Sequence, residues 1–120
     1  MELVEDKHKS DFNILKYSNE YILIGDKSYS KPIIFFDSKI SDFKINQPNS
    51  INYRDIERYI QSVDLLLIGT GLDTIIPNEE LIKIMYDNKK GLEFMNTESA
   101  CKTHNLLLSE NRSFSSILYP

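Results

Sequence analysis

Cys101 and His104 are the residues of this chain best suited to nucleophilic chemistry, and they stand three positions apart. If the surrounding stretch is helical, this spacing puts both side chains on one face of the helix. An imidazole beside a thiol raises the fraction of thiolate, the reactive form in nucleophilic catalysis. We expect neither a metal site nor a bound cofactor, because nothing near the pair supplies the two or three further ligands that zinc requires.

The same helix offers a simpler explanation of this pair. Both residues belong to an apolar stripe with the spacing of a core-facing helix, whose members are Ala100, Cys101, His104, Leu107 and Leu108. Buried cysteine commonly behaves as a small, inert hydrophobe. We therefore interpret the pair as part of a packed core and keep catalysis as the alternative.

A turn containing two glycines, Gly69-Thr70-Gly71, directly follows the apolar run at 65–68. After a buried strand, such a turn can bring backbone N–H groups close to a phosphate. However, the third glycine of the dinucleotide-binding fingerprint and the Gly-Lys-Ser/Thr of a phosphate loop are both missing, and the next helix starts several residues later, near Pro77. We therefore predict a tight turn that lets neighbouring segments pack closely.

A ligand site is the alternative at the junction between Gly69–Gly71 and the helix start Asn96–Asn105. Open α/β sheets tend to bind ligands at the carboxyl ends of strands, near a switch in strand order. Thr103 and Asn105 flank the apolar stripe, so they could hydrogen-bond to the glycine turn or face a small ligand. The candidate ligand-binding residues are Gly69, Thr70, Gly71, Asn96, Thr97, Cys101, Thr103 and Asn105.

Alternating helices and strands position these residues in the second half of the chain. Their signals are apolar periodicity, capping residues and glycine or proline at the ends. The predicted elements are a helix capped by Asn52, a strand at 65–68, a helix opened by Pro77 and ended at 88–91, a strand at 92–95, a helix capped by Asn96 or Thr97 and running to about Leu108, and a strand at 113–118.

The first half of the chain is typical of strands and loops. Short β-favouring runs separated by turns predict a β-meander over residues 12–36. Residues 37–50 contain Asp, Ser, Asn and Pro, and we predict a connection that crosses the surface. Residues 1–11 lack periodicity and are expected to form a flexible arm, followed by a single domain of residues 12–120.

Composition excludes several classes of function. The 120 residues suffice for one domain, and a net charge of −4 argues against nucleic-acid binding. A single cysteine excludes an internal disulfide and fits a reducing compartment. No apolar run approaches the ~20 residues that span a bilayer, and the N-terminus lacks the apolar centre of a secretion signal. We therefore expect a cytoplasmic protein without membrane insertion.

The motifs from residue 65 onward resemble a known family. LLLIGTG, the downstream Pro77, LEFM followed by NTESACKTHNLL, and ENR before the last strand are similar to the Mth938-domain family. That family includes mitochondrial respiratory complex I assembly factor 3, adipogenesis-associated proteins and many short bacterial and archaeal proteins. The resemblance extends to the hairpin YILIGDKSYSKPII and covers about residues 12–120. The chain departs from the family at Asn96 (usually Asp), at His104 (usually Tyr) and at Lys102, which lacks the bidentate anion binding of the usual Arg.

The resemblance implies a single three-layer α/β domain, with a mixed central β-sheet flanked by about three helices and an N-terminal β-meander. The family has no established catalytic activity, and its eukaryotic members assist assembly of a respiratory complex by binding other proteins. We therefore predict a non-enzymatic protein-binding or assembly-helper module, whose partners are other proteins and which could form a homo-oligomer. The alternative is a small-molecule-binding protein or enzyme that uses the junction between Gly69–Gly71 and Asn96–Asn105.

Overall fold

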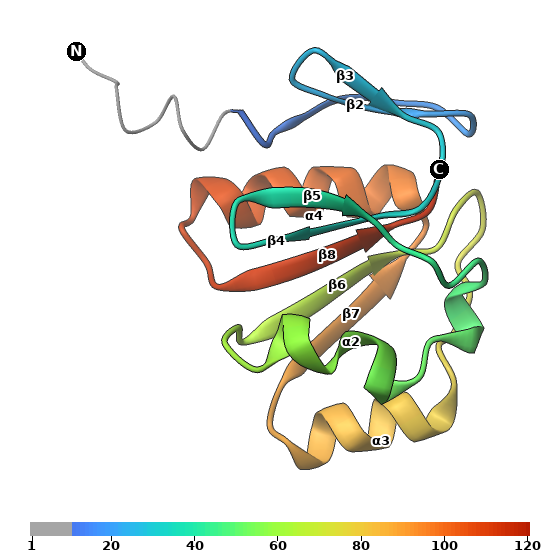
Figure 1. Ribbon diagram of the computed structural model, residues 1–120, viewed down its shortest axis with the longest axis vertical. Coiled ribbons are helices and arrows are strands. Elements are labelled where there is room, and N and C mark those ends of the chain that lie inside the picture. The colour runs from blue at the N-terminus through green and yellow to red at the C-terminus, as the bar shows by residue number, and fades with distance from the viewer. Residues whose placement is uncertain (1–10) are drawn as a thin grey trace.

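A five-stranded mixed β-sheet forms the centre of the computed structural model, which describes residues 11–120 (Figure 1). Its strand order is β5-β4-β8-β6-β7. β6 is parallel to β7 and β8, whereas β4 is antiparallel to β5 and β8, which confirms the predicted mixed sheet. The bounds are Ile33–Phe36 (β4), Lys39–Asp42 (β5), Leu65–Gly69 (β6), Gly91–Met95 (β7) and Phe114–Leu118 (β8). The predicted arm at 1–11 lies, except for Asp11, outside the described residues.

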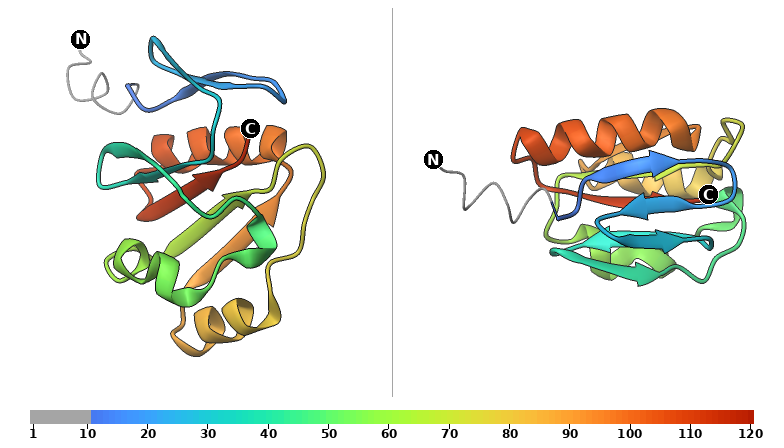
Figure 2. Two further views of the ribbon diagram at one scale, coloured as in Figure 1. Left: turned by 45° about the vertical axis from the view of Figure 1, so that its right-hand side comes forward. Right: turned by 90° about the horizontal axis from the view of Figure 1, so that it is seen from above.

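Three α-helices within residues 11–120 cover the two faces of this sheet (Figures 1 and 2). α2 (Tyr53–Ile60) and α3 (Glu79–Asp87) lie on one face, and α4 (Thr97–Ser109) lies on the other. Every residue of β6 and β8 is buried, as expected for strands covered on both sides. The predicted three-layer α/β architecture is therefore confirmed.

Successive residues of β6 point into two separate cores. Leu65 and Leu67 join the core beneath α4, which also contains Cys101. Leu66 and Ile68 join the core beneath α2 and α3. This alternation follows from the two-residue period of a strand, and it explains why a run of apolar residues was needed at this position.

Asparagines begin each of the three helices. The Asn52 N–H donates to the Asp55 carboxylate at 2.9 Å. Asn78 and Asn96 use their side-chain oxygens instead, accepting from Leu81 N–H at 2.8 Å and from Ser99 N–H at 2.9 Å. These bonds satisfy backbone donors that have no partner inside a helix, so the predicted caps at Asn52 and Asn96 are confirmed.

The first three strands form a second, antiparallel sheet in the order β1-β2-β3. They are β1 (Ile14–Tyr17), β2 (Ile22–Ile24) and β3 (Lys27–Tyr29), and they lie on the same side of the central sheet as α4 (Figure 2). The prediction of one continuous meander over 12–36 is wrong in its last strand, because β4 belongs to the central sheet. An apolar run indicates that a strand is covered, but not which sheet it joins.

The prediction of a surface connection at 37–50 is also wrong in part. Residues 39–42 form β5, paired with β4 through a hairpin whose turn residues Asp37 and Ser38 have φ of 53° and 56°. A short 3-10 helix, η1 (Pro48–Ser50), follows before α2. Phe43, between these two elements, is buried in the core beneath α2 and α3.

Candidate functional site

The glycine turn at the end of β6 is packed against the first turns of α4. A Cβ atom added to Gly69 would lie 2.8 Å from Ala100 Cβ and 3.0 Å from Thr97 Oγ1. These distances leave no room for a methyl group, so glycine is what allows β6 and α4 to approach this closely. The tight turn is confirmed, and protein atoms fill the junction at this point.

Thr97 holds the junction together. Its buried hydroxyl accepts from Gly71 N–H at 2.7 Å and donates to the Tyr119 carbonyl oxygen at 2.6 Å. The Thr97 N–H in turn donates to the Gly71 carbonyl oxygen at 2.8 Å. These bonds tie the ends of β6 and β8 to the start of α4. Gly71 and Tyr119 are distant from Thr97 in sequence. The sequence therefore placed Thr97 among the candidate residues but did not predict these contacts.

Thr70 shapes the loop that follows the turn. Its side chain is 4% exposed, and its hydroxyl donates to the Asp73 carbonyl oxygen at 2.6 Å and accepts from Ile75 N–H at 3.0 Å. Its backbone N–H donates to Met95 at the end of β7. Because its hydroxyl already makes two hydrogen bonds to backbone groups, Thr70 stabilises the conformation of the loop.

His104 is a buried hydrogen-bonded residue of α4. Its Nε2 lies 3.0 Å from the Phe12 carbonyl oxygen, and its Nδ1 lies 2.8 Å from Ser116 Oγ. A carbonyl oxygen can only accept, so we assign the proton to Nε2 and let Nδ1 accept from the serine hydroxyl. Burial lowers the pKa of His104 to about 4, although the bond to Phe12 opposes the shift. The ring is therefore neutral at pH 7.

Cys101 is 6% exposed in the core beneath α4, on the predicted stripe. Burial, together with a smaller effect of the nearby Glu98 carboxylate, raises the pKa of its thiol to about 12. At neutral pH the thiol is therefore protonated, and both ring nitrogens of His104 have other partners. This geometry favours packing over a nucleophile–base pair.

Asn105 joins α4 to the small sheet. Its side-chain oxygen accepts from Ile14 N–H at 2.7 Å, and its side-chain nitrogen donates to the Ile14 carbonyl oxygen at 2.9 Å. Thr103 instead lies with its hydroxyl 3.5 Å from the sulfur of Met95. The interpretation that Thr103 or Asn105 binds the glycine turn is therefore wrong, because Thr97 performs that role.

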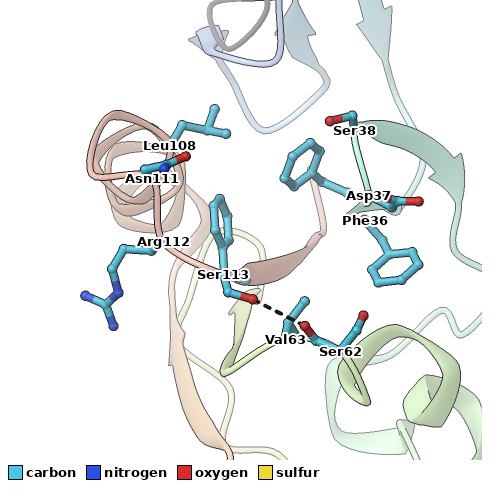
Figure 3. A pocket seen from close by; sticks show the side chains of 11 residues that line it. Phe36, Asp37, Ser38, Ser62, Val63, Leu108, Asn111, Arg112 and Ser113 are labelled. Atoms are coloured by element: carbon cyan, nitrogen blue, oxygen red, sulfur yellow. Dashed lines mark hydrogen bonds between the residues drawn. The ribbon is translucent and has the colours of Figure 1, made fainter.

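Among the surface hollows of the described residues, one lies away from the predicted junction and another borders α4 beside Cys101 and Asn105. The first, of about 400 Å³, is lined by three phenylalanines, among them Phe36, and by serines, where the β4–β5 turn meets the segments after α2 and α4 (Figure 3). The Arg112 side chain extends away from it, 3.8 Å from Glu110. The other, of about 240 Å³ between β1 and α4, is lined partly by Cys101 and Asn105. The remaining six candidate residues line neither hollow.

Residues 11–120 contain neither a metal-binding cluster nor a membrane-spanning helix. Within this part of the chain, no group of three or more His, Cys, Asp or Glu side chains is arranged to hold a metal ion. None of the helices described there is long and apolar enough to cross a membrane.

The chain is similar to known proteins in both sequence and fold. The model of a family described as a protein of unknown function (DUF498/DUF598) matches residues 14–119. The chain belongs to this family. A solved structure from Bordetella pertussis, a Mth938-like domain, has the same fold with a TM-score of 0.75, covering 92% of this chain and 87% of that one at 19% identity. The resemblance to the Mth938-domain family is thereby confirmed.

Two curated relatives carry descriptive names. The chain is 29% identical over 121 residues to a "13 kDa major membrane protein" of Francisella tularensis, covering 98% of each. It is also 29% identical over 110 residues to Drosophila melanogaster NADH dehydrogenase (ubiquinone) 1 alpha subcomplex assembly factor 3. That match covers 88% of this chain but 53% of the relative, so the chain spans about half the length of the fly protein. Both names describe the relatives alone.

Proposed function

We propose that the protein is a non-enzymatic module that binds other proteins, as an assembly helper does. The observation that carries the proposal is the similarity to an assembly factor over most of this chain. The fly protein is about twice as long, and therefore its activity and partners come to this chain only as part of the proposal.

The geometry of the junction supports the same proposal. Thr97, Thr70 and Asn105, which could have bound a ligand, each use their side chains to hold distant backbone groups. Cys101 and His104 lie in the core, with pKa values that keep both uncharged at pH 7. Residues used in this way are suited to maintaining a rigid surface, which favours binding over chemistry.

Affinity capture tests the proposal. For this experiment a tag is added to the N-terminus of the chain, and the tagged protein is produced at near-native level. It is cross-linked in cells before capture. Tag alone serves as the control. We expect the same protein partner in independent captures, and its complex with this chain should be reconstituted from purified components. Failure to recover a reproducible partner under several conditions contradicts the proposal.

The rival function is binding or conversion of a small molecule at the junction between Gly69–Gly71 and Asn96–Asn105. Its support is the position of the junction at the carboxyl ends of β6 and β7, where open α/β sheets tend to bind ligands. The close contact of Gly69 with Ala100 weighs against it. A metabolite that raises the melting temperature saturably and shifts the Thr97 and Gly71 amide resonances favours the rival.

A cytoplasmic location and self-association belong to the proposal as well. The Francisella relative is named a membrane protein, so fractionation of cells into soluble and membrane portions is the appropriate test of location. Recovery mainly with membranes that salt and carbonate do not release contradicts a cytoplasmic protein. Sedimentation velocity of the purified chain decides between a monomer and a homo-oligomer.

A further inference from the structure

The loop between β6 and α3 presents two large aliphatic side chains to solvent. Leu72 is 72% exposed and Ile76 is 66% exposed, although both residue types are usually buried. The loop projects beyond the carboxyl ends of β6 and β7 (Figures 1 and 2). Single exposed aliphatic residues are ordinary on protein surfaces, so the case for a contact surface here rests on two of them lying on one projecting loop.

Hydrogen bonds hold this loop at both ends. At its start, Thr97 binds Gly71 and Thr70 binds Asp73 and Ile75. At its end, the Asn78 side chain donates to the Ile51 carbonyl oxygen at 2.6 Å, and Pro77 is buried. Leu72 and Ile76 therefore project from a backbone that is already ordered, so little conformational entropy is lost when a partner covers them.

The charged residues nearest in sequence to Leu72 and Ile76 are acidic, whereas in space Glu80 lines a surface hollow together with Arg54. Residues 70–82 contain Asp73, Glu79 and Glu80, which are exposed, and include no Lys, Arg or His. An apolar pair bordered by carboxylates is complementary to an apolar pocket bordered by basic side chains. The same charges repel an anionic membrane surface, and they repel the same loop of a second copy.

We propose that the loop of residues 71–78 is the docking surface for a protein partner that offers an apolar pocket bordered by Lys and Arg. Leu72 and Ile76 enter the pocket, and Asp73 and Glu79 face its basic border. This inference rests on the proposed function and adds to it the location of the contact and the chemistry of the partner. The candidate residues Gly71, Thr70 and Thr97 then serve binding indirectly, by fixing the loop.

Site-specific cross-linking followed by a binding measurement tests the inference. A photoreactive benzophenone amino acid is placed at position 72, and in a matched chain at position 106, because Leu106 is also exposed, at 55%, on α4. The cross-linked partner is identified, the contacted peptide is mapped, and the partner is purified. Its Kd is then measured for the unchanged chain, for the Leu72→Ser/Ile76→Ser variant and for Leu106→Ser, after melting curves establish that all three are folded.

We expect cross-links from position 72 to a partner segment rich in apolar residues and Lys or Arg. The Leu72→Ser/Ile76→Ser variant should weaken binding by about 10- to 100-fold, and Leu106→Ser by less than about 2-fold. Binding by the unchanged chain should also weaken as NaCl rises from ~0.05 to ~0.5 M.

Other outcomes overturn the inference in distinguishable ways. A partner that binds the loop variant as tightly as the unchanged chain, or that cross-links only from position 106, removes the docking loop but leaves the protein-binding function intact. Absence of cross-links from both positions, while affinity capture still recovers a partner, also removes the docking loop alone. Absence of a partner from affinity capture as well contradicts the proposed function itself. Loop-dependent flotation with phosphatidylserine vesicles identifies a membrane as the occupant, and loop-dependent dimers in sedimentation identify a second copy. Either result overturns the inference.

Discussion

Acidification should destabilise this protein through His104, because the fold holds the imidazole neutral. In the unfolded chain an ordinary histidine takes up a proton below pH ~6.5, whereas burial lowers the pKa of His104 in the fold to about 4. Between these values the unfolded chain binds more protons, so stability falls as the pH falls. The stabilisation that comes from holding His104 neutral is fully present above pH ~6.5. At about 1.4 kcal/mol for each pH unit down to ~4, the loss amounts to about 3 kcal/mol.

A His104→Gln variant isolates this contribution. Glutamine does not titrate, but its amide can still donate to the Phe12 carbonyl oxygen and accept from Ser116. Free energies of unfolding come from urea titrations followed by circular dichroism at several values between pH ~7 and ~4. The only other histidine, His8, lies outside the described residues and is common to both proteins, as are the carboxylates, so their titrations cancel in the difference.

The unchanged protein should lose about 3 kcal/mol more than the variant over this range. Equal pH dependence of the two proteins would refute the reasoning, since it would mean that His104 is protonated as readily in the fold as in the unfolded chain. A smaller but clear difference would mean that water reaches the ring.

Three other substitutions or reactions probe the same packing. Gly69→Ala should lower the free energy of unfolding by about 1–3 kcal/mol, because the new methyl group collides with Ala100; unchanged urea curves would indicate an open junction. Native Cys101 should react with iodoacetamide at least about 100-fold more slowly than in urea, because burial raises its pKa to about 12; similar rates would show an accessible thiolate. Asn105→Ala should cost about 1–3 kcal/mol and speed hydrogen exchange in β1, because both backbone groups of Ile14 lose a partner; unaltered β1 protection would count against this clamp.

Signals that are local in sequence predicted most of the fold. Asn96 caps α4 through Ser99, only three residues away, and the apolar run at 65–68 becomes a strand covered on both faces. The stripe that contains Cys101 and His104 faces the core because side chains three and four residues apart share a face of a helix. These features need no knowledge of the distant chain.

β5 escaped prediction because its sequence does not look like a strand. Of its four residues, Lys39–Asp42, only Ile40 is apolar, and two of the others are charged. An edge strand accepts polar residues on both faces, and charges there discourage pairing with other chains. The assignment of β4 to the central sheet was missed for a related reason, since the pairing of Ile34 with Ile117 depends on chain folding rather than on local pattern.

The functional interpretation of the junction depended on contacts that no local pattern reveals. Thr97 binds Gly71 and Tyr119, which lie 26 and 22 residues away. Asn105 binds Ile14 across 91 residues. The polar residues of the region are visible in the sequence, but their hydrogen-bond partners follow only from the arrangement of β6, β8 and α4.

The central claim is that hydrogen bonds between Thr97 and Gly71 close the junction and hold the loop of residues 71–78 in place. The exchange rate of the Gly71 amide proton tests it most directly. In the fold this N–H donates to the buried Thr97 hydroxyl at 2.7 Å. Its exchange should therefore require global unfolding, should remain slow in Thr97→Ser, and should become faster in Thr97→Val, which lacks the acceptor. A Gly71 amide that exchanges rapidly in the unchanged, folded protein would show an open cleft and contradict the account.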